Sequence, residues 1–514
     1  MRRRIVPRLF FVIAPTRIPN QGIAMYYKIR NKILFRQYGH YGYITDNSEF
    51  GFRLLNDTNI QLGETFVSEV GSIMLSKLSK NPREIDDIID DLMEIFQNVE
   101  RKTVKADTME FFQQFVNQGY LSAGASPETC LDQNQPFSST ATETDKKKIT
   151  SSEEEGSIPP IGPNDFLRSI HFDVASACNE HCVHCYVPDR CKTKTIESKL
   201  FFQVLQEARD LNAIHVTLSG GEPLLHKDLT AFLERSRELD LSVNVLSNLT
   251  LLTDDIIAEM KRNPLLSVQT SLYSMDAQTH DSITGLPGSF EKTVSGVLRV
   301  SSAGIPVQIS CPIMKQNVDS FFDVVVWGKR QNIAVAVEPM IFASYDHSRN
   351  NVQNRISPIQ FKNILDQKMS ENYAATLREV AMEKESLTED DPICSVCRYS
   401  LCVSVDGDVF PCAGWQSNAI GNLNQCTLKE IWETSEEVKH LRSIKRRDFP
   451  KCVDCEDRGY CTVCMMANSN ENPNGNPFLI DNFRCQVAAM THRKVIDLLQ
   501  DAAHNESEIS AELQ

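Results

Sequence analysis

Three cysteines, Cys178, Cys182 and Cys185, are spaced C-x3-C-x2-C directly after an apolar run at 170–175 that predicts a β-strand. Three thiolates this close together can hold three irons of a cubane iron–sulfur cluster and leave the fourth iron without a protein ligand. Structural metal sites normally fill every coordination position, so an open position indicates a site that does chemistry. A zinc site with a distant fourth ligand and a group of buried thiols are the two alternatives.

A second motif favours the catalytic interpretation. The next predicted strand, at 214–218, is followed by Gly220, Gly221 and Glu222. Adjacent glycines let a backbone approach a ligand closely, and a carboxylate suits an ammonium partner. Together, the two motifs resemble the signature of the radical S-adenosylmethionine (SAM) superfamily. The resemblance implies that the three cysteines bind a [4Fe–4S] cluster, that SAM chelates the open iron, that Gly220, Gly221 and Glu222 hold the SAM amino group, and that SAM cleavage gives a 5′-deoxyadenosyl radical.

Two further strand ends resemble positions that touch the ribose or carboxylate of SAM in relatives. Asn248 follows the strand predicted at 242–246, and Ser271 ends the strand predicted at 266–271. Relatives commonly read Ser-Leu-Asp-Gly at the second position, whereas this chain reads Ser-Leu-Tyr-Ser from Ser271. Polar residues that only cap strand ends are the alternative for both. The sequence assigns no catalytic side chain.

The C-terminal part contains a second dense group of cysteines. Cys394 and Cys397 form a C-x2-C pair, and Asp406-Gly407 between two alternating runs predicts a hairpin turn that returns Cys412 beside Cys397. A C-x2-C-x5-C-x2-C run and one later cysteine follow: Cys452, Cys455, Cys461, Cys464 and Cys485. Taken alone, these pairs are also typical of a zinc ribbon.

This arrangement resembles the SPASM extension of peptide-modifying radical SAM enzymes, which holds two auxiliary [4Fe–4S] clusters. The resemblance assigns the first cluster to Cys394, Cys397, Cys412 and Cys464, and the second to Cys452, Cys455, Cys461 and Cys485. Cys402 leaves the ligand set of the first cluster ambiguous. In sulfatase-modifying relatives an aspartate that acts as a base follows the hairpin cysteine, but here the residue is Ala413.

Strand and helix patterns alternate between residues 167 and 343. Six strands are expected, at 170–175, 214–218, 242–246, 266–271, 307–312 and 333–337, with helices between them, for example at 199–211 and 290–303. Six such units predict an α/β fold, a partial parallel (β/α)6 barrel with its chemistry at the carboxyl ends of the strands. Both SAM motifs fall at such ends.

The N-terminal part predicts a small winged-helix domain. Short strands at 33–36, 41–45 and 50–55 precede three helical patterns. The first helix uses Phe66 and Leu78, the second begins at a capping box from Asn81 to Glu84, and the third stops at Gly119. The domain resembles the recognition element of enzymes that modify ribosomally made peptides, where a leader peptide adds as an extra strand. An unrelated winged helix or a structural cap is the alternative.

Composition limits the possible partners. Lys+Arg 53 against Asp+Glu 68 gives a net charge of −15, and the second helix is itself acidic, so nucleic-acid binding is disfavoured. The sixteen cysteines follow no convincing secretory signal and no membrane span is expected, so a cytoplasmic protein with metal-bound thiolates is predicted.

The expected parts are an extension at 1–24, the winged helix at 25–123, a disordered linker at 124–165, the barrel and a bridge at 166–391, the SPASM domain at 392–500 and a tail at 501–514.

These parts together predict a peptide maturase. The N-terminal domain would bind the leader of a ribosomal precursor peptide, and the adenosyl radical would take hydrogen from a core residue. The auxiliary clusters would accept the electron released when a thioether or carbon–carbon cross-link forms. An external donor of the flavodoxin or ferredoxin type is expected. The alternatives are a radical SAM oxidase of another protein side chain or of a small molecule, and a zinc-binding protein without catalysis.

Overall fold

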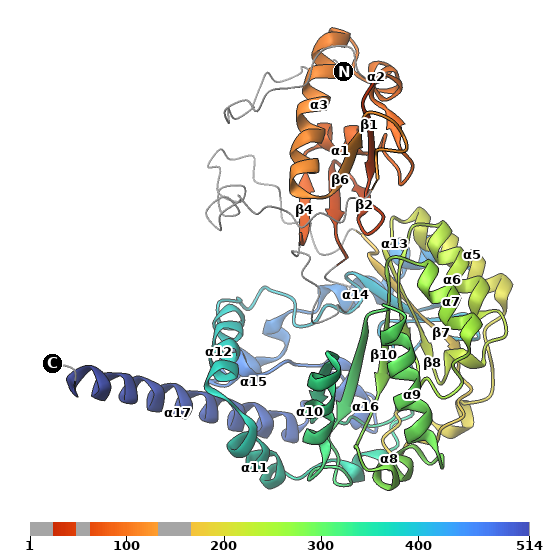
Figure 1. Cartoon of the computed structure of the whole chain (residues 1–514). Helices are drawn as coiled ribbons and strands as arrows, with labels where there is room; N and C mark the ends of the chain where they lie inside the picture. Colours follow the sequence, from red (N-terminus) through yellow and green to blue (C-terminus); the bar gives the residue numbers. More distant parts are fainter. Residues whose placement is uncertain (1–23, 48–61, 132–165, 513–514) are drawn as a thin grey trace. The chain divides into compact units, whose positions relative to one another are not determined.

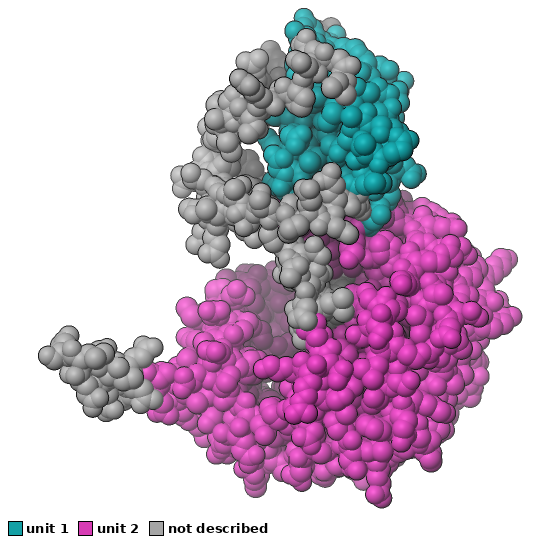
Figure 2. Space-filling view, in the orientation of Figure 1, with its two compact units in different colours: residues 1–31, 69–135 teal, residues 32–68, 136–514 magenta. Residues whose placement is uncertain are grey.

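The computed structural model describes residues 24–47, 62–131 and 166–512 (Figure 1). The chain forms two compact units, one from Met1–Asn31 with Glu69–Gln135 and one from Lys32–Ser68 with Pro136–Gln514 (Figure 2). The expected extension, the strand at 50–55 and most of the expected linker lie outside the described residues.

The first unit is a three-stranded sheet with three helices. The strands are β1 (Tyr26–Ile29), β5 (Arg83–Glu84) and β6 (Leu121–Gly124), with β1 in the centre. The helices are α1 (Glu69–Leu75), α2 (Ile85–Met93) and α3 (Arg101–Gln118). The third helix ends at Gly119 as predicted, because this residue adopts φ 92°.

The capping box expected at residues 81–84 is wrong. Glu84 pairs with Tyr26 of β1 in the antiparallel ladder, and its carboxylate accepts a hydrogen bond from the Tyr26 hydroxyl at 3.3 Å. Helix α2 therefore begins at Ile85, three residues after the expected first helical residue Pro82, without a side-chain cap. A strand partner far away in the sequence has replaced the local capping interaction.

A second small sheet belongs to the other unit. It is formed by β2 (Leu34–Tyr38), β3 (Tyr41–Thr45) and β4 (Glu64–Val67), in that order. Its buried Tyr38 and Tyr43 share an apolar cluster with Ile214 and Leu265 of the barrel. The segment expected as one winged helix is thus divided between the units, and Phe66 lies in β4 rather than in a helix.

The predicted alternation of strands and helices is present in the barrel. Its six parallel strands are β7 (Ser169–Ala175), β8 (His215–Gly220), β9 (Ser242–Leu246), β10 (Leu266–Ser271), β11 (Val307–Pro312) and β12 (Ala334–Glu338). Its helices are α5 (Ser198–Asp210), α6 (Leu229–Glu238), α7 (Asp254–Arg262), α8 (Ala277–Thr284), α9 (Ser289–Ser302) and α10 (Phe321–Gln331). The strands follow one another in sequence order across the sheet.

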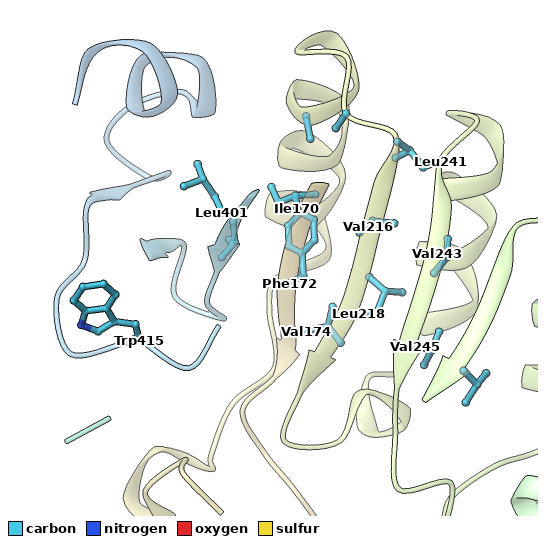
Figure 3. Packing of buried hydrophobic residues seen from close by; sticks show 14 of the residues in the cluster. Ile170, Phe172, Val174, Val216, Leu218, Leu241, Val243, Val245, Leu401 and Trp415 are labelled. Atoms are coloured by element: carbon cyan, nitrogen blue, oxygen red, sulfur yellow. The ribbon is translucent and has the colours of Figure 1, made fainter. Parts of the chain in front are cut away.

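Strand β7 shows how the two faces of this sheet differ. Ile170, Phe172 and Val174 are buried in the core beneath the helices (Figure 3). Because side chains alternate along a strand, the residues between them, His171 and Asp173, point to the inner face. The inner face of the barrel therefore carries polar groups where the outer face is apolar.

The C-terminal part continues the barrel sheet. Strand β13 (Ser400–Val403) pairs in parallel with β7, and β14 (Asp408–Phe410) and β15 (Gly421–Asn422) extend the sheet to nine strands. Leu401 and Trp415 enter the same apolar core as the barrel residues (Figure 3).

Helices cover the rest of this region. They are α11 (Pro358–Lys368), α12 (Glu371–Glu385), α13 (Leu428–Thr434), α14 (Glu436–Ser443), α15 (Pro450–Val453), α16 (Met465–Glu471) and α17 (Asn482–Glu512). The tail expected from residue 501 is the end of helix α17. In the described parts of the chain, no helix is long and apolar enough to cross a bilayer.

Candidate iron–sulfur and SAM site

The loop after β7 brings the three cysteines of the first motif together. The Cys185 amide donates to the Cys182 carbonyl at 3.0 Å, which closes a turn. Burial and nearby charges together raise the pKa of Cys178 to about 11. Burial and the charges of its neighbours also raise the pKa of Cys182 well above its usual value. Cys178 and Cys182 are therefore poor anions by themselves, so the donor set fits a cationic iron cluster that offsets their charge.

Gly220 and Gly221 have a structural role beside the predicted one. A Cβ on Gly220 would lie 2.0 Å from the Ala175 carbonyl oxygen, and a Cβ on Gly221 would lie 2.4 Å from that of Ala177. The Gly221 amide donates to the Ala175 carbonyl at 2.6 Å. Only glycines let the end of β8 lie this close to the cysteine loop. Their contact with the SAM amino group stays a prediction.

Glu222 is fully buried at the centre of the same turn. Its Oε1 accepts hydrogen bonds from the Leu224 amide at 2.9 Å and the Ser247 hydroxyl at 2.7 Å, and its Oε2 accepts one from the Asn248 amide at 2.7 Å. Burial raises the pKa of Glu222 to about 7. The carboxylate thus joins the ends of β8 and β9, and its predicted contact with SAM is not tested.

The structure places Asn248 beside the cysteine loop. Its Nδ2 donates to Asn179 Oδ1 at 2.9 Å, and its own Oδ1 accepts from the Thr250 hydroxyl at 2.8 Å. Ser271 ends strand β10, level with Ser310 of β11. Contacts of Asn248 and Ser271 with SAM stay predictions.

Sequence reasoning missed three side chains around Cys182. The Tyr273 hydroxyl lies 4.0 Å from Cys182 Sγ and 3.5 Å from His184 Nε2, and burial lowers the pKa of His184 to about 4. The Cys182 thiol donates to Glu180 Oε2 at 3.3 Å. Tyr273 occupies the position where relatives commonly have aspartate, and this difference was the only signal in the sequence.

The C-terminal cysteines gather into two groups of four. In the first, burial, together with the charges of Cys464 and Cys394, raises the pKa of Cys412 to about 11. Burial raises the pKa of Cys397 to about 12, with contributions from Cys412 and Cys394. The hairpin of β13 and β14, which turns at Gly407, brings Cys397 and Cys412 together as expected.

The second group contains the remaining four predicted ligands. Burial raises the pKa of Cys452 to about 11, and the charges of Cys461, Cys485 and Cys455 act in the same direction. The structure therefore brings together the same two sets of four thiols that the sequence assigned to two clusters. Four thiolates suit either a cubane cluster or a tetrahedral zinc ion, so the metal itself stays a prediction.

Three family models match the chain. The radical SAM superfamily model matches residues 173–327, the SPASM iron–sulfur cluster-binding domain matches residues 394–456, and the model of coenzyme PQQ synthesis protein D (PqqD) matches residues 63–121. Together they cover most of the barrel, five of the eight auxiliary cysteines and most of the N-terminal region.

The chain is similar to several characterised proteins. It is 28% identical over 328 residues to an AdoMet-dependent heme synthase of Methanosarcina barkeri, which covers 58% of this chain and 90% of the relative. It is 24% identical to the subtilosin biosynthesis protein AlbA of Bacillus subtilis, over 61% of this chain and 71% of AlbA. The fold resembles Streptococcus suis SuiB bound to its precursor peptide SuiA, with a TM-score of 0.58 and 15% identity over 89% of this chain and 99% of SuiB.

The partial barrel, the cysteine loop at the end of its first strand and the glycine turn beside it define a radical SAM enzyme. Within that class, this chain is a radical SAM enzyme with a SPASM domain and a PqqD-like peptide-recognition element.

Proposed function

We propose that this enzyme binds the leader of a ribosomally synthesised peptide and oxidatively joins core residues through a thioether or carbon–carbon bond. The observation that carries the proposal is one chain with three features: a PqqD-like region, a radical SAM barrel and two groups of four thiols. An enzyme that only cleaves SAM would need neither the PqqD-like region nor the two groups of four thiols.

Strand β4 supports leader binding. It pairs with β3 on one side and is, with β2, one of the two edge strands of its sheet among the described residues. An extended peptide can add to such an edge through main-chain hydrogen bonds, with side-chain pockets giving specificity. The PqqD match includes β4. The leader would bind here, while the core peptide enters the barrel.

The two auxiliary thiol groups support an oxidative reaction. Formation of a cross-link removes two hydrogens from the peptide, whereas epimerisation removes none. With SAM bound to the first cluster, the site would supply a 5′-deoxyadenosyl radical. Each auxiliary set offers four thiols, so neither needs an open metal position, and this favours electron transfer over binding of substrate. An external flavodoxin- or ferredoxin-like donor would reduce the first cluster.

The test uses the anaerobically reconstituted enzyme with SAM, dithionite and the short peptide encoded beside its gene. The expected product is lighter than the peptide by two hydrogens, and a leaderless version of the same peptide should give little product. An unchanged mass with inverted stereocentres would refute the cross-linking proposal.

A second candidate is oxidation of a small molecule related to haem. The match to AdoMet-dependent heme synthases over 328 residues favours it. This alternative gives the PqqD-like region no role. A titration with the neighbouring peptide separates the two candidates, because an enzyme for a small molecule would not bind the leader.

A further inference from the structure

A polar cluster lies on the inner face of the barrel, outside the ligand sets assigned above. Strand β7 contributes His171 and Asp173, and strand β13 places Cys402 opposite His171 in the parallel ladder. His171 Nε2 lies 3.3 Å from Asp173 Oδ1, and one donor atom of each of the three residues lies within 4.8 Å of the others. The side chains of His171 and Asp173 remain 20% and 14% exposed, so a group inside the barrel can reach them.

Gln416 fixes the carboxylate of Asp173 beside the first auxiliary thiol group. Its Nε2 donates to Asp173 Oδ2 at 2.6 Å and to the Ala413 carbonyl oxygen at 2.9 Å. Ala413 directly follows Cys412 in the sequence. A single amide therefore connects Asp173 to the loop that carries an auxiliary cysteine.

Asp173 also lies near the radical-forming site. Its strand, β7, ends at Ala175, three residues before Cys178. In the parallel ladder Asp173 is level with Ser219 of β8, the residue before Gly220. Asp173 is thus close to the SAM motifs and, through Gln416, to the loop of Cys412, the region where a substrate radical would be formed and oxidised.

The proposed cross-linking reaction requires a proton acceptor in this region. One substrate C–H bond breaks and its hydrogen atom leaves with 5′-deoxyadenosine. When the carbon radical bonds to a second residue, that residue's S–H or C–H hydrogen must leave as one proton and one electron. An oxidised iron–sulfur cluster, if held by an auxiliary thiol group, would accept the electron, and a base inside the barrel must take the proton. Cys402 cannot accept the proton, because burial raises the pKa of its thiol and keeps it protonated.

We propose that Asp173 is this proton acceptor, held toward the substrate by Gln416 and adjacent to His171, which can share the proton. The assignment rests on the proposed oxidative function and adds the residue that this function needs. It also accounts for Ala413, because the carboxylate on strand β7 reaches the neighbourhood of that position from a different segment of the chain.

The test separates hydrogen abstraction from product formation. Wild-type, Asp173→Asn and Asp173→Glu enzymes are incubated with SAM, dithionite and the peptide encoded beside the gene, deuterated in its core residues. Deuterium in 5′-deoxyadenosine reports abstraction, and loss of two hydrogens from the peptide reports product. Asp173→Asn should keep abstraction within about twofold of wild type and lower product about 10²-fold, the usual contribution of a general base. Asp173→Glu should restore part of the product.

Asp210→Asn, at the exposed end of α5, is the matched control. It should change neither the deuterium content of 5′-deoxyadenosine nor the amount of product. Iron content of each variant confirms that the clusters are retained. Equal product from Asp173→Asn and wild type would overturn the assignment alone. Wild-type enzyme that leaves the peptide mass unchanged would overturn the proposed function and the assignment together. One zinc per chain that is lost in His171→Ala would also overturn it, because the cluster would then be a metal site.

Discussion

Replacement of Gly221 by alanine should remove the SAM-binding cluster and leave the auxiliary clusters. The added Cβ would lie 2.4 Å from the Ala177 carbonyl oxygen and 2.5 Å from that of Ser176, and both neighbours are backbone atoms. Ordinary contact begins near 3.4 Å, so the loop must move by about 1 Å. Functional sites tolerate displacements of only about 0.5 Å.

The energetic cost of Gly221→Ala can be worked from the same contacts. Movement of the loop weakens the hydrogen bonds from the Gly221 amide to Ala175 and from the Glu222 amide to Ala177, at 2.6 and 2.9 Å. Two such bonds are worth about 0.5–1.5 kcal/mol each, and overpacking costs about 1–3 kcal/mol. The total cost of Gly221→Ala is thus about 2–6 kcal/mol, and it destabilises the segment just before Cys178.

Iron analysis and electron paramagnetic resonance of the reconstituted protein provide the assay. Wild type should contain about twelve irons per chain, and Gly221→Ala about eight, because each cubane holds four. Gly304→Ala is the control: unlike Gly221 it has a positive φ, 78°, but no atom lies within 4 Å of the added Cβ, so it introduces backbone strain without a clash. A Gly221→Ala protein with about twelve irons and an unchanged SAM-dependent spectrum would refute the steric argument.

Three further predictions concern the auxiliary groups, Glu222 and a buried ion pair. Cys464→Ala and Cys485→Ala should each lower the iron content by about four per chain, and zinc in place of iron in wild type would contradict both. Because burial raises the pKa of Glu222 from 4.5 to about 7, the folded state binds this proton more tightly than the unfolded state. Glu222 should therefore contribute a fall of about 3 kcal/mol in the free energy of unfolding of the SAM-free protein, measured in urea, from pH 4.5 to pH 7. The pKa of Glu180 is also raised to about 7 and adds to the slope in both proteins. Glu222→Gln should make the slope shallower by the share of Glu222, and equal slopes in both proteins would disprove the raised pKa. Arg355→Met should cost about 3–5 kcal/mol, because it leaves the buried carboxylate of Glu471 with only Arg349, 3.6 Å away, as a cationic partner. A double variant with Glu471→Leu should recover most of that loss in thermal unfolding.

The barrel could be predicted closely from the sequence because its parallel strands are buried apolar runs with clear ends. The strands at 242–246, 266–271 and 307–312 have the expected bounds. Each cysteine motif is a local pattern, and one turn or hairpin suffices to gather most of its thiols.

Interactions between distant segments could not be predicted. Glu84 pairs with Tyr26 in a strand instead of capping a helix, and no local sequence pattern indicated this pairing. The cluster of Asp173 with Cys402 depends on the parallel register between β7 and β13, which lie more than two hundred residues apart. Local periodicity shows which residues share one face of a strand, but it does not show which strand will be the neighbour.

The shared sheet also limits how this enzyme can be engineered. Since β13 hydrogen-bonds to β7 and Leu401 packs with Ile170, the two catalytic halves are not interchangeable modules joined by a tether. A chimera cut before residue 392 would leave the first barrel strand with a bare edge, open to self-association. Exchange of the auxiliary half between homologues would therefore have to preserve the pairing of β7 with β13 or replace both strands together.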